Sequence, residues 1–357
     1  MNVAGIGVVF AGGRGINNYD DALRRGWMSP SLIELPSTQN KTFPVYRIEL
    51  ETITDKEFFW TVRRADRFSK MAMIAALDAL QDSGIVLDDK KSSLGIIVAT
   101  AFGPHVTTFR FLDDILNYGD VNVSPTIFSH AVHNAATSYI ALVLNSRGPT
   151  VTLTQFAFSF HQALILAQIW LHEERCEYVL VGSVDECGTV MNYICSRKLK
   201  IAYDGRIKPF HFSASPVAVP GEGSVFFLVA RGKCPKRYCE IYGVSGFDNH
   251  IEEDEPDMYI LDADGMAGGE TKYRNEAASD VKIAGYAPLF GSMMTGSGFH
   301  CAVGALELKN QIQYACPVQD NPYGANVCMV TKETKIDEIS CIRYNCVHER
   351  AVIILKR

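Results

Sequence analysis

The stretch that most constrains the fold is residues 148–167, which reads GPTVTLTQFAFSFHQALILA. Residues 151–153 are β-branched or apolar and predict a short buried strand. A tight elbow at 155–158 follows, and then a helical run at 161–170 that is apolar on most faces. A strand that enters a helix through a sharp turn is where α/β enzymes often mount a nucleophile. The sequence therefore predicts an α/β protein with a candidate site at this elbow.

The composition is that of an ordinary folded protein. The 357 residues are enough for one large or two small domains with a well-buried core. Apolar residues make up 47% and charged residues 21%, and a net charge of −6 does not favour nucleic acid as a partner. No stretch approaches the ~20 apolar residues of a membrane span, and residues 1–10 lack the basic segment of a signal peptide. We expect neither a nucleic acid nor a membrane partner.

Ten cysteines are scattered along the chain without the spacing of a metal site. They predict reduced, mostly buried thiols and a cytoplasmic protein. His130 and His133 lie three residues apart with no nearby acid or cysteine, so packing explains them better than metal ligation. We expect no metal and no cofactor.

Strands and helices are predicted to alternate along the chain. Buried strands are expected at residues 2–10, 94–99, 178–182, 224–230 and from about 240 onward. An amphipathic helix is expected at 68–83, with Asp66 as its N-cap and Gly84 just past its end, and another at about 107–116.

The pair Gly5-x-Gly7 could suggest a dinucleotide site, but the details argue against one. Phe10 stands where the third glycine is needed, and no ribose-binding acid follows at the usual distance.

Several motifs resemble those of the β-ketoacyl synthases, in which a Gly-Pro strand runs into Thr-Ala-Cys and a helix. Counting from Gly148 and Pro149, the cysteine position falls on Ala157. The helix that follows keeps the register at Ala163, Leu164 and Ala167. A two-residue shift would place Gln155 there instead, but it would break both matches.

Further segments extend this resemblance from residue 2 to about residue 330. They are Arg64-x-Asp66-Arg67-Phe68, the run 124–139, Lys208-Pro209-Phe210 and Gly221-Glu222-Gly223. The run 124–139, SPTIFSHAVHNAATSY, is similar to that of the chain-length factors, the non-catalytic β-subunits of type II polyketide synthases.

The resemblance implies the thiolase fold, an α/β fold whose duplicated βα halves form five layers in the order α-β-α-β-α. The strand that begins near residue 240 is interrupted by glycines, as the start of the chain is, so we place the boundary between the two halves near residue 235. Residues 1–235 would form a ketoacyl-synthase-like half with a degenerate nucleophile elbow, and residues 236–357 a thiolase-like half.

The resemblance also implies that the catalytic residues are missing. A decarboxylating synthase needs a thiol for the acyl chain and two imidazoles that donate hydrogen bonds to an enolate oxygen. The thiol position is Ala157, the imidazole positions match Asp264 and Ser292, and the family's lysine matches Ala287. An ionised Asp264 would repel an enolate, and Ser292 could donate one bond, but not from the position of an imidazole.

A chain-length factor, as the resemblance implies, pairs with a catalytic ketosynthase and shapes the tunnel for a polyketide chain carried on an acyl carrier protein. We expect the heterodimer to form about the edge strand that contains Thr150, Val151, Thr152 and Leu153, paired antiparallel with the same strand of the synthase. The residues expected to line the tunnel are Phe102, His105, Phe109, Leu112, Phe128, His133, Phe156 and Phe158.

Three other functions remain open at this point. A self-sufficient thiolase-fold acyltransferase could use relocated residues, with Cys301 and His300 as the best candidates, although adjacent helical residues point about 100° apart. A malonyl decarboxylase could dispense with the thiol, but both imidazole positions are lost. The third is an unrelated scaffold or storage protein.

Overall fold

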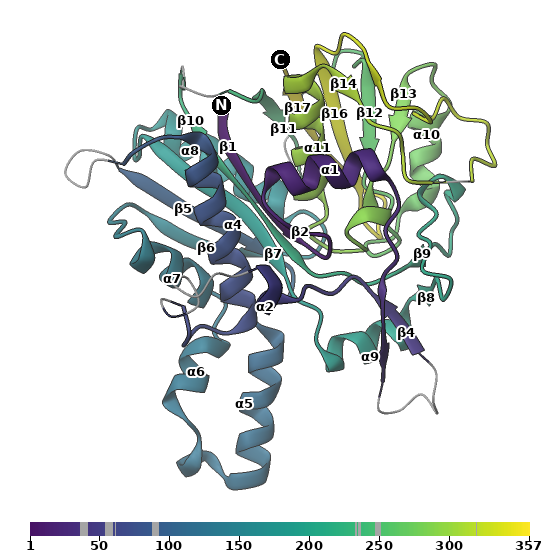
Figure 1. Cartoon of the computed structure of the whole chain (residues 1–357). Coiled ribbons are helices and arrows are strands. Elements are labelled where there is room, and N and C mark those ends of the chain that lie inside the picture. Colours follow the sequence, from purple (N-terminus) through teal and green to yellow (C-terminus); the bar gives the residue numbers. More distant parts are fainter. Residues whose placement is uncertain are drawn as a thin grey trace.

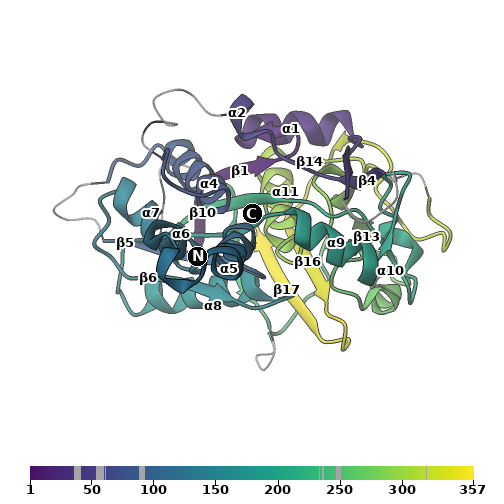
Figure 2. The same cartoon turned by 90° about the horizontal axis from the view of Figure 1, so that it is seen from below.

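The computed structural model describes residues 1–35, 42–53, 60, 62–87, 93–232, 234, 237–246, 251–318 and 320–357. Its main sheet has eleven strands and divides into two halves that meet at a short antiparallel pairing of Asn2 with Glu240. The two halves lie side by side in Figure 2. Among the helices of the described residues, none is both long and apolar enough to cross a membrane.

Both halves of the sheet have the same strand order. The N-terminal half runs in space β1 (Asn2–Phe10), β10 (Gly223–Ala230), β7 (Tyr178–Asp185), β5 (Leu94–Thr100) and β6 (Thr150–Thr154). The C-terminal half runs β11 (Glu240–Val244), β17 (Arg350–Lys356), β16 (Glu338–Tyr344), β12 (Met258–Leu261) and β13 (Lys282–Ala284). In chain order both halves read 1-5-4-2-3, with two antiparallel pairings followed by two parallel ones. The duplication predicted from the resemblance is confirmed.

Helices cover the sheets in layers (Figure 1). The helices α4 (Arg67–Ser83) and α7 (Ala135–Val143) lie on the outer face of the N-terminal sheet. The central layer holds α8 (Ser159–His172) and α11 (Ser297–Asn310), which contact strands of both sheets and each other. The outer C-terminal layer is thin, because the described part of the β11–β12 connection, 251–257, contains no helix. Short η3 (Glu270–Tyr273) and α10 (Arg274–Ala277) supply its helical part.

The remaining elements are additions to these layers. In chain order they are β2 (Gly13–Arg14), α1 (Ile16–Arg25), β3 (Ser31–Glu34), β4 (Thr42–Val45), α2 (Leu50–Ile53), α5 (His105–Tyr118), η1 (Asp120–Asn122), α6 (Pro125–Ala131), α9 (Thr189–Lys198), β8 (Lys200–Ile201), η2 (Pro209–His211), β9 (Val217–Ala218), η4 (Ala287–Leu289), β14 (Ile312–Gln313) and β15 (Lys332–Glu333). Figure 1 shows α5 and α6 projecting together from the N-terminal half.

The alternating side chains of the strands explain why helices pack on both faces. In β10, Phe226 and Leu228 belong to the core under α4, whereas Phe227 and Val229 belong to the core that contains α8. A strand buried on both faces carries mostly apolar side chains, and all eight residues of β10 are buried.

The glycines of β1 are required by the close approach of α4. A Cβ on Gly7 would lie 2.0 Å from the Ala75 carbonyl oxygen, and one on Gly5 would lie 2.2 Å from that of Ala79. These glycines therefore serve helix–sheet packing. They give no reason to expect a nucleotide at this position.

Several local predictions are confirmed. The Asp66 side chain accepts a hydrogen bond from the Ser69 N–H at 2.9 Å, and Gly84 ends α4 at a φ of 68°. The helix expected at 107–116 is α5, and seven of the ten cysteines are buried.

Two other predictions are not confirmed. The strand expected to be buried at 151–153 is β6, which lies at the sheet edge and is half-buried at best, so its apolar character is not explained by the core of this chain. The boundary at 235 lies outside the described residues and stays a prediction.

Candidate functional site

The elbow predicted at residues 155–158 is present between β6 and α8, but it carries no nucleophile. Ala157 is 9% exposed and packs in a small apolar cluster with Phe158, Ala267 and Ala351, beside the partly buried Met294. The space around the position expected for a thiol is thus filled by hydrophobic side chains. The β16–β17 hairpin, which supplies Ala351, closes this cluster from the C-terminal half.

Asp264 and Ser292 serve as fixed hydrogen-bond partners of the backbone. The two carboxyl oxygens of Asp264 accept from the N–H groups of Met266 and Met293, each at 2.9 Å. The Ser292 hydroxyl donates to the Asp264 carbonyl oxygen at 2.5 Å and accepts from the Val219 N–H at 3.1 Å. Both side chains are fully buried. They tie three segments of the chain together and present no donor pair to an enolate.

A buried arginine, Arg343 on β16, completes the centre. Its guanidinium pairs with the Asp262 carboxylate, donates to the Met293 carbonyl oxygen at 3.0 Å, and lies 4.0 Å from Asp264. On the other side of Asp262, the Nδ1 atom of His300 lies 3.0 Å from a carboxyl oxygen. His300 Nε2 accepts from the Tyr286 N–H at 3.2 Å, which assigns the ring proton to Nδ1.

The surroundings of Asp262 and Asp264 shift the pKa values of the two carboxyl groups in opposite directions. Burial by itself would raise the pKa of Asp262, but the charge of Arg343, with contributions from His300 and Ser297, holds it below the usual range. Burial raises the pKa of Asp264 to about 7, against the opposing effect of Arg343. The cluster is therefore a structural charge network in which one acid is the stable partner of the arginine.

The sequence analysis missed Arg343 and Asp262. A signal was present in both cases. An arginine in the buried segment ISCIRY is unusual and requires a buried acid as its partner. Asp262 directly follows the apolar run 258–261 and stands two positions before Asp264, so the two acids approach the same place.

The positions considered for the family's lysine and for a relocated catalytic site are also buried. Ala287 begins η4 and is 1% exposed. Cys301 is fully buried, and burial raises the pKa of its thiol well above the usual value, which disfavours the reactive thiolate. His300 is held by Asp262. This packing argues against a relocated Cys301–His300 site.

The strand expected at the dimer interface is the edge of the sheet. Within the described residues β6 pairs with β5 alone, so its other edge is unpaired. Thr150 is exposed, and Val151, Thr152 and Leu153 are half-buried. The hydroxyls of Thr137 on α7 and Thr152 lie 2.5 Å apart, which holds the strand against that helix.

The predicted tunnel residues differ in their exposure. Four are exposed or nearly so, namely Leu112, Phe128, His133 and Phe156, and two are half-buried, Phe102 and Phe109. His105 and Phe158 are buried within this chain. Ring contacts link the group, with centroids of Phe102 and Phe156 5.6 Å apart and those of His105 and Phe109 6.4 Å apart.

His105 is held from two sides. Its Nε2 atom accepts from the Gly188 N–H at 3.4 Å, and its Nδ1 lies 3.8 Å from Glu186. Burial lowers the pKa of His105 to about 4 and raises that of Glu186 to about 8, so both favour the neutral form. His130, in turn, bonds the Tyr139 hydroxyl at 2.7 Å, which agrees with a packing role.

Comparison with known proteins agrees with this architecture. Residues 1–233 match the family model described as beta-ketoacyl synthase, N-terminal domain. The "Putative polyketide beta-ketoacyl synthase 1" of Streptomyces halstedii is 26% identical over 276 residues, and the match covers 69% of this chain and 63% of that protein. The chain thus spans less than two thirds of the length of this relative.

Two solved structures share the fold along nearly the whole chain. The ishigamide ketosynthase/chain length factor has a TM-score of 0.79 at 17% identity, over 99% of this chain and 98% of that one. The ketosynthase in the AntDE:AntF complex with its acyl-carrier protein has a TM-score of 0.78 at 14% identity, with the same two coverages. The predicted thiolase fold is confirmed, and with the match over residues 1–233 the chain belongs to the β-ketoacyl synthase family.

Proposed function

We propose that this chain is a non-catalytic chain-length factor that pairs with a ketosynthase and shapes the tunnel for a growing polyketide. The observation that carries the proposal is the use of all three catalytic positions for structure. Ala157 lies in an apolar cluster, and Asp264 and Ser292 are buried and bonded to backbone groups. Such an arrangement can preserve the fold of a synthase but not its chemistry.

The surface of the N-terminal half supports pairing with another subunit. The unpaired edge of β6 offers a row of backbone donors and acceptors that another strand can use. Around it, α5, α6, α7 and the elbow expose large apolar side chains, which are Leu112, Leu116, Phe128, Leu142 and Phe156. A lone soluble chain seldom exposes so many together.

A ketosynthase of the same fold is the partner that this surface fits best. It would present an equivalent edge strand, so the two strands could pair antiparallel about a pseudo-twofold axis. The similar structures include a ketosynthase/chain length factor and a ketosynthase bound to an acyl-carrier protein. We expect an obligate interface of roughly 2,000 Å² or more.

The tunnel would run beside this interface. Phe156 on the elbow contacts the Phe102 ring, and Phe109 lies on α5; a wall shared with the partner would form beside them. His105 and Phe158 are packed inside this chain, so we assign them to the support of that wall.

The experiment compares the isolated chain, the ketosynthase and their complex with malonyl-carrier substrate. We expect no acetyl or condensed product from the isolated chain, and product of defined length from the complex. The variant Ala157→Cys restores the thiol without the imidazoles and should remain inactive. Turnover by the isolated wild-type chain, abolished by Cys301→Ala, would instead support the self-sufficient enzyme.

A further inference from the structure

A polar groove lies between β8 and the segment 203–217. It consists of a cavity of about 370 Å³ and an adjoining one of about 240 Å³. Both are lined by Asp204, Arg206 and Lys208, so they form one continuous depression. Their size is that of a small-molecule site.

The larger cavity is lined by the buried carboxyl group of Glu270, one of whose oxygens lacks a hydrogen-bond partner among the described residues. Glu270 is 4% exposed, and one of its carboxyl oxygens accepts the Gly265 N–H at 3.0 Å. Its other oxygen, Oε2, is buried and has no hydrogen-bond partner among the described residues. Buried polar atoms are nearly always bonded, so a hydrogen-bond donor that enters the cavity would complete this one.

Cationic side chains surround the rim. Lys200, Arg206 and Lys208 line the cavities, and Lys200 forms no ion pair within the described part of the chain. The Arg206 guanidinium lies over the Trp27 ring at 4.1 Å from its centroid. Lys208 pairs with the exposed Asp320 at 3.4 Å, so it can exchange that partner for a ligand.

The acids of the rim do not cancel this charge. Asp204 and Asp320 face three cations, and one oxygen of Asp204 is already used by the Arg206 backbone N–H at 3.1 Å. Burial raises the pKa of Glu270, which reduces its repulsion of an anion at the rim. The groove thus combines cationic side chains at its rim with a hydrogen-bond acceptor, Glu270, in the larger cavity.

We infer that this groove binds a phosphate ester whose organic arm carries a hydrogen-bond donor. The phosphate group lies between Lys200 and Lys208, whose two charges match the dianion of a monoester and exceed the single charge of a diester. The arm extends into the larger cavity, where an amide N–H or a hydroxyl donates to Oε2 of Glu270.

Two sources can supply this chemistry. One is a free metabolite that is a phosphate monoester, and the other is the prosthetic arm of a carrier protein, whose phosphate is a diester. The groove itself does not depend on the proposed function. Only the second source does, since it presumes a carrier protein as a partner.

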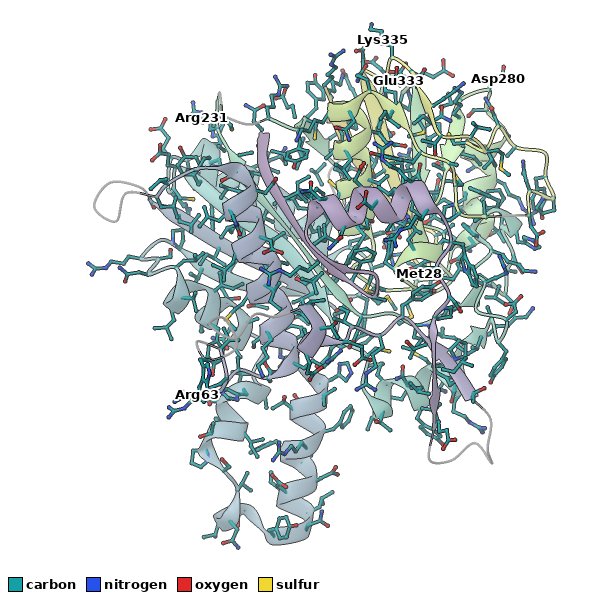
Figure 3. The ribbon with its side chains drawn as sticks, in the orientation of Figure 1. Met28, Arg63, Arg231, Asp280, Glu333 and Lys335 are labelled. Carbon is teal, nitrogen blue, oxygen red and sulfur yellow. The ribbon has the colours of Figure 1, made fainter. Side chains whose placement is uncertain are left out.

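The test measures binding by calorimetry to the full chain, in complex with its ketosynthase where that is needed. The probes are free 4′-phosphopantetheine, pantetheine without phosphate, and a carrier protein in its forms with and without the arm. The groove variant is Lys200→Ala/Lys208→Ala, and the control is Lys335→Ala. Lys335 is an exposed lysine at the top of Figure 3, far from Met28, the neighbour of Trp27.

We expect phosphopantetheine to bind at least about tenfold more tightly than pantetheine, and the groove variant alone to lose that difference. Glu270→Gln should weaken the binding of both arms alike, because the amide nitrogen cannot accept their donor. Binding of the free arm without any preference for the armed carrier assigns the groove to a metabolite. Loss of armed-carrier affinity in the groove variant assigns it to the carrier.

Equal affinity for the two free arms in the wild type overturns the inference, as does an unchanged affinity in the groove variant. Either result leaves the proposed chain-length function intact, because the length of the product from the complex is measured separately.

Discussion

Removal of the buried arginine tests whether the charge network around Asp262 stabilises the fold. In Arg343→Met the apolar stem is retained and the charge is lost, so the Asp262 carboxylate stays buried at 3% exposure without its main partner. Breaking a buried pair in this way costs about 3–5 kcal/mol of unfolding free energy. Loss of the bond to the Met293 carbonyl oxygen adds to this cost.

The pH dependence of this loss has a definite sign. The folded pKa of Asp262 lies below its unfolded value, so the pair contributes its full stability above about pH 4 and loses it as the pH falls through the folded pKa. In Arg343→Met the carboxyl group loses the largest factor that lowers its pKa. The variant should therefore approach the wild type in stability as the pH is lowered from 7 toward 4.

Urea unfolding of the wild type, Arg343→Met, Asp262→Asn and the double variant at pH 7 measures the coupling. We expect the double variant to be more stable than the sum of the single losses predicts, by about 2 kcal/mol or more. The reasoning is refuted if Arg343→Met costs less than about 1 kcal/mol, or if the two losses are additive.

Three further variants test the interface, the tunnel and the packing of the first strand. Leu153→Asp on β6 should abolish the heterodimer in size-exclusion chromatography. The control Val86→Asp, at a residue that is 91% exposed on the monomer, should not. Persistence of the complex in Leu153→Asp would exclude β6 from the interface. Phe109→Ala in the complex should lengthen the polyketide by mass spectrometry at a small cost in stability, whereas Phe158→Ala should cost about 3–5 kcal/mol and leave the length unchanged. Gly7→Ala places a Cβ 2.0 Å from a carbonyl oxygen of α4, so it should lower the unfolding midpoint strongly; a neutral result would contradict the packing of β1 on α4.

Local pattern accounts for most of the elements and for the prediction that the catalytic groups are missing. The 3.6-residue period between Asp66 and Gly84 predicted α4 with both of its ends, because caps and periodicity are properties of neighbouring residues. The resemblance to the synthases placed Ala157, Asp264 and Ser292 at the catalytic positions. Side-chain chemistry alone then predicts that these residues cannot replace a thiol and two imidazoles.

Only the tertiary structure decided which side chains surround Asp264 and Ser292 and which surfaces remain open. Arg343 and Asp262 are 81 positions apart and meet because β16 and β12 are neighbours in the sheet. The apolar residues 151–153 read as a buried strand, yet β6 lies at the sheet edge, because hydrophobicity does not distinguish a core from an interface. Strand order and burial arise from contacts between distant segments, and local sequence periodicity carries no record of them.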